Sequence, residues 1–136
     1  MVKAIEKAGV AERSTVQSFV LELLPEINAR NSSIKTSALF QPTRFQGLMM
    51  ILGFNADRED IIEQSMEIKA DVISPYYLYA NREFVENCHR YNMKVIPWTV
   101  NEEDTMEELF TAGGDGVISD YPALLYKTYE KWLKFK

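Results

Sequence analysis

The sequence predicts an α/β fold in which parallel strands alternate with helices. Short β-branched or apolar runs alternate with amphipathic runs of roughly ten residues, and in the clearest part the strands recur at intervals of roughly twenty residues. Strands that are joined by helices pair in parallel, through right-handed crossovers. We therefore expect about five strands and six helices in a single domain that covers residues 1–136.

The first part of the chain predicts the order helix, strand, helix, strand. Gly9 follows the first helix, as a C′ glycine does, and Pro25 falls in the first turn of the second helix, where a missing N–H costs little. The stretch 41–55 is the least regular, and its run Leu48–Phe54 is compatible with a strand, a helical turn or a buried loop. The expected elements are a helix at Val2–Ala8, a strand at Thr15–Val20, a helix at Leu21–Ile27 and a strand at Ile34–Phe40.

The second part shows a clearer pattern. Asp57 is a suitable N-cap for a helix that carries Ile61 and Ile62, and Asn101 is a suitable N-cap for a helix with an acidic first turn and a Gly113–Gly114 exit. The expected elements are strands at Asp71–Pro75, Lys94–Val100 and Gly116–Asp120, with helices from Asp57, from Asn81 or Tyr79, over Glu102–Ala112 and from Pro122.

Composition excludes several classes of protein. Fifteen basic residues against twenty acidic ones give a net charge of −5, which does not suit binding to nucleic acid phosphates. The longest apolar run, Leu48–Phe54, is far shorter than the ~20 residues of a membrane span. The N-terminus has no secretory signal pattern, which favours the cytoplasm without establishing a compartment. The single Cys88 excludes a disulfide framework within the chain.

In parallel α/β folds, ligands bind at the carboxyl ends of the strands. The residues at those ends are therefore the first candidates for a site. They are Gln17–Phe19, Phe40–Gln41, Ser74–Tyr77, Trp98–Asn101 and Ser119–Pro122.

Two of these strings resemble the glycerophosphodiester phosphodiesterase family. The chain reads Val-Ile-Pro-Trp-Thr-Val-Asn at 95–101 and, after one helix, Ala-Gly-Gly-Asp-Gly-Val-Ile-Ser-Asp-Tyr-Pro at 112–122. The strings Gln-Ser-Phe at 17–19 and Ile-Ser-Pro at 73–75 fit upstream strands of the same family. The resemblance covers roughly Val2–Leu125 and implies part of a (βα)8 TIM-type barrel, about half of it, of the kind found in PLC-like phosphodiesterases.

The family's catalytic strings are not in the chain. The resemblance implies a His-Arg-Gly motif, a Glu-x-Asp pair and a second catalytic histidine in the N-terminal half of the barrel, whereas His89 is the only histidine here. We therefore expect the chain to be the C-terminal part of such a barrel, with no catalytic residue and no metal ligand of its own. The implied reaction hydrolyses a glycerophosphodiester to glycerol 3-phosphate and an alcohol, with Mg²⁺ or Ca²⁺ bound outside this chain. The isolated chain is predicted to be inactive.

The resemblance also implies which residues line the substrate. Phe19 and Trp98 match aromatic residues that form an apolar wall beside the glycerol, although both also suit a barrel core. Asp120 lies at the carboxyl end of a strand, where it could line the site. An Asx-type cap of the last helix explains an aspartate at this position equally well. The complete set of candidate lining residues is Phe19, Trp98, Gln17, Tyr76, Asn101 and Asp120.

Other reactive residues have simpler explanations. His89 suits the C-terminal end of a helix, where a cation is favourable. Cys88 and His89 are adjacent on a helix and point about 100° apart, so they do not form a nucleophile pair. Glu102–Asp104 could be imagined as metal ligands, but compensation of the helix dipole explains these acids sufficiently.

Two other functions are compatible with the pattern. A non-catalytic half-barrel would leave open strand edges at Val16–Phe19 and Val117–Ser119, and open edges favour self-association into a homo-oligomer. A flavodoxin-like domain fits the length and the strand count, but no phosphate-binding glycine-rich loop follows the first strand.

Overall fold

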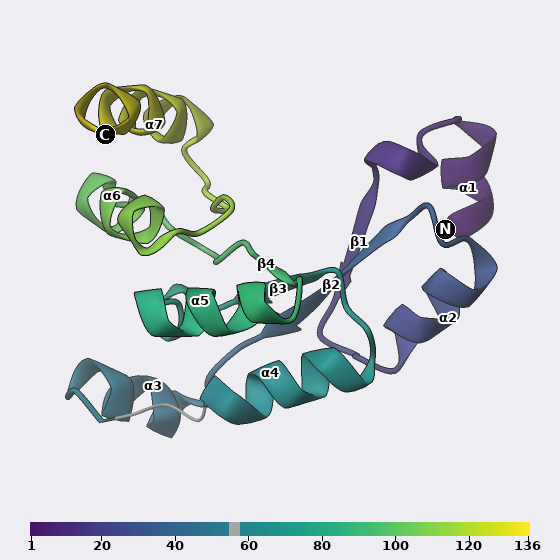
Figure 1. Cartoon of the computed structure of the whole chain (residues 1–136), viewed down its shortest axis with the longest axis horizontal. Coiled ribbons are helices and arrows are strands. Elements are labelled where there is room, and N and C mark those ends of the chain that lie inside the picture. Colours follow the sequence, from purple (N-terminus) through teal and green to yellow (C-terminus); the bar gives the residue numbers. More distant parts are fainter. Residues whose placement is uncertain (55–57) are drawn as a thin grey trace.

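The computed structural model describes residues 1–54 and 58–136. Figure 1 shows the expected α/β architecture, with a parallel sheet whose strand order is β1-β2-β3-β4. Sequential order in the sheet follows when each crossover helix leads to the next strand on the same side. The strands are β1 (Thr15–Ser18), β2 (Lys35–Phe40), β3 (Val72–Pro75) and β4 (Lys94–Val95).

Helices connect the strands and continue past the last of them. In Figure 1, α4, α5, α6 and α7 follow one another as a stacked layer. The helices are α1 (Val2–Lys7), α2 (Leu23–Arg30), α3 (Arg44–Ile51), α4 (Arg58–Glu67), α5 (Arg82–Arg90), α6 (Glu103–Ala112) and α7 (Pro122–Phe135), with 3₁₀ turns η1 (Ala11–Arg13) and η2 (Tyr77–Tyr79). None of the helices in the described residues is both long and apolar enough to cross a bilayer.

The helices cover one face of the sheet. Ala38, Ile73 and Val95 lie opposite one another in register and are all buried against helices. Because strand side chains alternate between faces, Ser37 and Ser74 belong to the opposite face. Their hydroxyl oxygens lie 2.8 Å apart in a buried hydrogen bond. The face away from the helices therefore carries polar groups between strands, as the interior of a barrel can.

The last predicted strand does not form a regular ladder. The sheet pairing of β4 ends at Val95, with one further bridge between Tyr76 and Trp98. The segment 115–118 still runs beside 95–100 through three backbone hydrogen bonds, from Asp115 N to Val95 O, from Ile118 N to Pro97 O and from Val100 N to Ile118 O, at 2.8–2.9 Å. The prediction of a strand at Gly116–Asp120 is thus wrong, because no strand ladder forms there. The segment nevertheless lies beside β4, where the predicted strand would lie.

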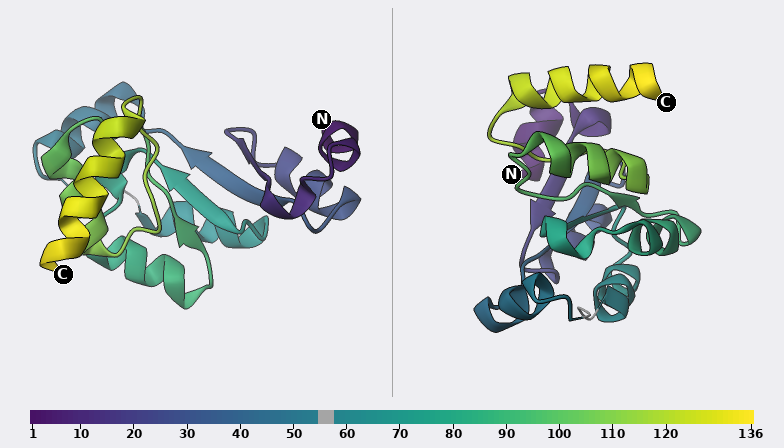
Figure 2. Two further views of the ribbon diagram at one scale, coloured as in Figure 1. Left: turned by 90° about the horizontal axis from the view of Figure 1, so that it is seen from above. Right: turned by 90° about the vertical axis from the view of Figure 1, so that its left-hand side faces the viewer.

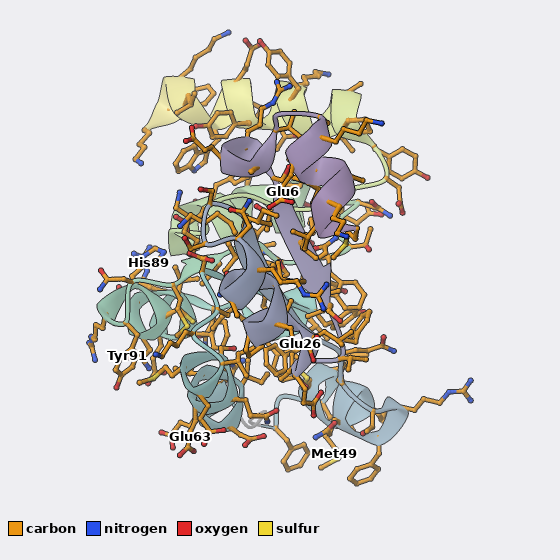
Figure 3. All side chains as sticks on the ribbon, turned by 90° about the vertical axis from the view of Figure 1, so that its right-hand side faces the viewer. Glu6, Glu26, Met49, Glu63, His89 and Tyr91 are labelled. Carbon is orange, nitrogen blue, oxygen red and sulfur yellow. The ribbon has the colours of Figure 1, made fainter. Side chains whose placement is uncertain are left out.

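The irregular stretch after β2 contains a helix. A capping box begins α3, since the Thr43 hydroxyl accepts from Gln46 N and the Gln46 side chain accepts from Thr43 N. Large apolar side chains of this stretch are 54–73% exposed, and Figure 3 shows Met49 at the outer end of the molecule. The members of this exposed apolar set are Phe45, Leu48, Ile51, Leu52 and Phe54.

Some of the predicted helix ends are confirmed and others are wrong. The Asn81 side chain accepts from Phe84 N and begins α5, and Gly113 ends α6 with φ +97°, in the left-handed region. Tyr79 ends η2 and does not begin α5. The predicted Asn101 cap is wrong, because the N-cap of α6 is Glu102 and its side chain makes no capping bond. The predicted cap at Asp57 lies outside the described residues.

The sheet is open at its first strand. β1 has one ladder partner, β2, among the described residues, so its other edge is unpaired. Figures 1 and 2 show the two termini far apart, the N-terminus beside β1 and the C-terminus at the far end of α7. A closed barrel brings its first and last elements together. The described chain is therefore an open part of such a curved sheet.

Asp71 joins the amino ends of β2 and β3. Its carboxylate accepts from Lys35 Nζ and from Thr36 N, both at 2.9 Å. Partial burial raises the pKa of Asp71, but the hydrogen bonds from Lys35 and Thr36 outweigh it and hold the pKa below the usual value. The ionised carboxylate therefore stabilises the folded state.

We predict that Asp71→Asn lowers the free energy of unfolding by about 1 kcal/mol at pH 7, because an amide replaces a charged acceptor at a partly exposed position. The pKa of Asp71 is lower in the folded state, so its contribution is complete above the unfolded pKa of about 3.9 and is lost as pH falls through the folded pKa. Urea unfolding at pH 7 and pH 3 measures this, with Glu12→Gln as an exposed control. A difference between wild type and Asp71→Asn that does not shrink at pH 3 would contradict it.

Candidate functional site

Three aromatic side chains meet at the carboxyl ends of the strands. The ring of Trp98 lies 5.5 Å from that of Phe19 and 6.0 Å from that of Tyr76, and both pairs are edge-to-face at 80–81°. These residues follow β4, β1 and β3, so only the fold brings them together. We call this group the aromatic wall. It unites three of the six predicted lining residues.

Trp98 is held in one orientation. Its indole Nε1 donates to the Ser74 carbonyl oxygen at 2.7 Å, and its own carbonyl oxygen accepts from Tyr77 N at 3.0 Å. Ser74 is itself fixed by its buried hydroxyl contact with Ser37. Sequence reasoning missed this pair of serines, because a serine in a strand does not reveal its partner. The pair makes the strand beneath the indole a rigid support.

The aromatic wall is partly open to solvent. Phe19 is 54% exposed, whereas Trp98 and Tyr76 are half-buried. Partial burial raises the pKa of Tyr76, and its hydrogen bond with Tyr77 adds to this, so the phenol remains protonated at neutral pH. An apolar face that is accessible yet held in place is suited to contact the carbon skeleton of a small ligand.

Asn101, which follows Trp98 by three residues, and Asp120, which follows Ser119, form a polar pair. Asn101 Nδ2 donates to Asp120 Oδ2 at 2.9 Å, while Asn101 Oδ1 accepts from Asp120 N at 3.0 Å. The Ser119 hydroxyl donates to the same Asn101 oxygen at 3.2 Å. Asn101 therefore fastens the segment 119–120 to the end of the β4 chain segment. This use of its side chain explains why it does not cap α6.

The Asx-type cap considered for Asp120 is absent. The N-cap of α7 is Tyr121, without a side-chain capping bond, and the amide of Tyr121 donates to the Ser119 hydroxyl at 3.0 Å. Asp120 is exposed, so its carboxylate is available beside Asn101. Capping of α7 therefore does not explain why an aspartate stands at position 120.

Gln17 lies apart from this pair. It is exposed on β1, opposite Ser37 in register, and it lines a groove between β1 and α2. Since Gln17 and Phe19 alternate with Ser18, they share a face of the strand. Gln17 therefore lies on the face of the sheet that Ser37 of β2 occupies, earlier along the chain than Phe19, and its role in lining a site stays a prediction.

His89 lies at the opposite end of the strands. It is in the last turn of α5, before β4 begins, and Figure 3 shows it on the outside of the molecule near Tyr91. Its Nε2 lies 2.8 Å from Asp115 Oδ2, the same oxygen that accepts from Val95 N at 2.8 Å. The pair joins α5, β4 and the glycine-rich loop, which is a structural role. Asp115 belongs to the Gly-Gly-Asp-Gly string, which does not indicate that its partner is His89.

The other reactive residues are also engaged elsewhere. Burial raises the pKa of the Cys88 thiol to about 12, and Asp115 contributes to the rise, so a thiolate is not present at neutral pH. Glu103 and Glu107 accept from Lys131 at 2.9 Å and join α6 to α7. The hydrogen bond from Lys131 lowers the pKa of Glu103. These acids connect helices.

The described residues do not fit a metal centre. Residues 1–54 and 58–136 contain no group of three or more histidine, cysteine, aspartate or glutamate side chains placed to hold an ion. Asp120 lies beside the side-chain amide of Asn101, which donates to its Oδ2.

Comparisons with known proteins agree with the architecture. The model of the glycerophosphoryl diester phosphodiesterase family matches residues 1–124. The glycerophosphodiester phosphodiesterase of Caldanaerobacter subterraneus subsp. tengcongensis is 28% identical over 131 residues, which are 96% of this chain and 48% of that protein.

Solved structures share the fold. A glycerophosphodiester phosphodiesterase from Parabacteroides distasonis superposes with a TM-score of 0.71 at 18% identity, over 98% of this chain and 48% of that one. An Oleispira antarctica phosphodiesterase, solved with the product sn-glycerol-3-phosphate, gives 0.64 at 19% identity, over 85% and 41%.

The chain spans about half the length of the relatives that it matches. The match nevertheless extends over most of its own residues, from α1 through the start of α7, and includes both motif strings at 95–101 and 112–122. On this evidence the chain belongs to the glycerophosphoryl diester phosphodiesterase family.

Proposed function

We propose that this chain supplies the carboxyl-end wall of the substrate site in a glycerophosphodiester phosphodiesterase barrel, while the catalytic groups lie on other strands. The single observation that supports this most is the aromatic wall, in which Phe19, Tyr76 and Trp98 meet at the end of the strands where ligands bind in this architecture. The product complex of the Oleispira antarctica relative supports glycerol 3-phosphate as the ligand chemistry.

Charge determines how a glycerophosphodiester would lie on this surface. The phosphate is anionic, and the exposed Asp120 carboxylate would repel it at close range. The glycerol part is neutral, with carbon-bound hydrogens that can pack on Trp98 and hydroxyl groups that can donate to Asp120. The glycerol is therefore the part that contacts this chain, and the phosphate points toward the part of the barrel that carries the catalytic groups.

The roles of the lining residues follow from their contacts. Trp98, held by its bond to Ser74, would be the fixed apolar surface, and Phe19 and Tyr76 would extend it. Asn101 is a positioning residue, since its amide already holds Asp120. Gln17 would reach the ligand from deeper along β1. Hydrolysis itself requires acid–base groups and a divalent cation from the family's N-terminal motifs.

A second candidate is a non-catalytic half-barrel that assembles with itself. The observation in its favour is the set of exposed apolar side chains near the two ends of the chain, including Val20 at 53%, Leu23 at 47% and Leu133 at 48%. Sedimentation of the purified chain at tens of micromolar distinguishes the candidates, because a stable homodimer supports this one and a monomer opposes it.

We predict that the isolated chain does not hydrolyse glycerophosphocholine with Mg²⁺ or Ca²⁺, because its single histidine lies at the wrong end of the strands. Release of glycerol 3-phosphate is the measurement, with an EDTA-treated sample and the variant His89→Ala as controls. Turnover that requires the cation and is proportional to the amount of protein would refute the prediction.

We also predict that sn-glycerol 3-phosphate perturbs Trp98 selectively. The chain has two tryptophans, and Trp132 packs against Phe110 and Tyr129 in the α6–α7 layer, so its indole is an internal control. In ¹H–¹⁵N spectra, the indole signal of Trp98 should shift with a dissociation constant in the millimolar range, and Asp120→Asn should weaken the effect. Equal shifts of both indoles, or the same shift with sulfate, would contradict the proposed site.

A further inference from the structure

We propose that α3 is a membrane-contacting helix, which inserts its exposed apolar side chains into the surface of a zwitterionic phospholipid bilayer. The contacting residues are the exposed apolar set of this segment together with Arg44. This inference goes beyond the proposed function and does not depend on it, because it concerns a surface outside the aromatic wall. The spacing, exposure, charge and position of the side chains support it.

The apolar side chains of α3 gather on the side of the helix that is turned away from the core. Phe45, Leu48 and Leu52 follow one another at intervals of three and four residues, so they lie on one side, and we call them the apolar stripe. They are 54–70% exposed, whereas Met50, on the opposite side of the helix, packs against the buried core. A surface helix of a globular protein has the reverse arrangement, with its apolar side facing the core. The stripe therefore favours an apolar environment from outside the chain.

The charge of this segment suits a lipid surface without net charge. Arg44 is exposed, it is the only charged residue in 41–54, and it forms no ion pair with another residue that the structure describes. It lies one turn before Leu48, so its guanidinium can pair with a lipid phosphate while the stripe enters the boundary of the acyl chains. The chain as a whole carries −5, which opposes binding to a strongly anionic membrane. A zwitterionic surface is therefore the best match.

A second copy of the chain fits the stripe less well. A symmetric dimer through this side of α3 would bring the two Arg44 guanidinium groups together, and the segment 41–54 has no carboxylate to pair with them. Figure 3 shows Met49 at the outer end of the molecule, so this helix stands at the edge of the protein. Protein partners bind apolar anchors in well-packed pockets, whereas a fluid lipid surface adapts to side chains that project outward.

The position of α3 places a bilayer at the carboxyl ends of the strands. The helix begins at Arg44, shortly after β2 ends at Phe40, and Figure 1 shows it beyond the carboxyl end of that strand. The aromatic wall follows β1, β3 and β4 at their carboxyl ends. The capping box of Thr43 and Gln46 fixes the first turn of α3, so the stripe is presented on a helix that is already formed. Membrane contact would therefore occur at the same end of the strands as the candidate site.

Flotation of the full chain with phosphatidylcholine vesicles tests the proposal. We expect weak, reversible binding, with a partition constant no greater than the ~10⁴ M⁻¹ of a single myristoyl chain. Binding should persist in ~0.5 M NaCl, because salt screens exposed charges but does not oppose apolar insertion. Absence of binding at roughly 10 mM lipid, or loss of binding at high salt, would overturn the proposal.

A matched pair of variants locates the contact. Phe45→Gln removes a 70% exposed phenylalanine from the stripe, and Phe135→Gln makes the same change at an 84% exposed position of α7. Because both side chains are exposed, we expect neither change to alter the fold, which circular dichroism melting checks. Phe45→Gln should weaken binding to the vesicles about tenfold or more, and Phe135→Gln should leave it unchanged. Equal effects of the two variants would count against α3 as the contact.

A fluorescent label reports insertion directly. Cys88 is fully buried, so an environment-sensitive fluorophore reacts at a thiol introduced by Leu48→Cys, or by Phe135→Cys as the control. Vesicles should shift the emission of the label at position 48 to shorter wavelength and leave the label at position 135 unchanged. Flotation without a shift at position 48 would assign the contact to another surface and overturn the proposal. A homodimer in lipid-free sedimentation that Phe45→Gln dissociates would show that a second copy covers the stripe, and would also overturn it.

Discussion

The right-handed crossover of each βα unit is the constraint on which the rest of this structure depends. It places the crossover helices α2, α4 and α5 on one face of the sheet, and the strands run in the same direction. Ala38, Ile73 and Val95 consequently form one layer under the helices, while Ser37 and Ser74 belong to the other face. The same rule assembles the carboxyl ends of strands that are far apart in sequence. Phe19 and Trp98 are thereby brought into contact across the sheet.

Side chains hold the segments that carry Trp98 and Asp120 in place, beyond the point where the pairing of β3 with β4 ends. Beyond Val95, regular pairing is replaced by a few backbone bonds and by the side chains of Asn101 and Asp115. Asp115 fixes the start of the last segment to the amino end of β4, and Asn101 fixes its end next to Asp120. These two residues belong to the motif strings at 95–101 and 112–122. Their contacts give a physical reason for those residue types at that spacing.

The sequence allowed prediction of most elements but not of how some residues are used. Amphipathic periodicity and the cap at Asn81 predicted α5, and Gly113 predicted the end of α6, because those signals are local. The pattern at Arg44–Ile51 does not distinguish a helix from a strand or loop, since its apolar residues do not share one buried face and most are exposed.

The role of a residue is hardest to predict when its side chain suits a local contact but bonds to a residue far away in the sequence. Asn101 is a good helix cap by type, yet its amide bonds to Asp120 and Ser119, nineteen and eighteen residues away, which no local pattern indicates. The buried pair of Ser37 and Ser74 joins neighbouring strands that are 37 residues apart in sequence. Resemblance indicated which residues are at the strand ends, but only the fold showed that Asp120 has no capping role.

The position of His89 separates it from the candidate site. His89 and Asp115 are at the amino ends of the strands, where they join α5 to β4, whereas the aromatic wall is at the carboxyl ends. Under the proposed function, the stabilising contacts and the ligand contacts are thereby separated along the strand direction, as in TIM barrels generally. Under the same proposal, the strand ends of this chain need only hold the glycerol in place. A wall of that kind requires rigidity more than reactivity, and the Trp98–Ser74–Ser37 chain of hydrogen bonds provides it.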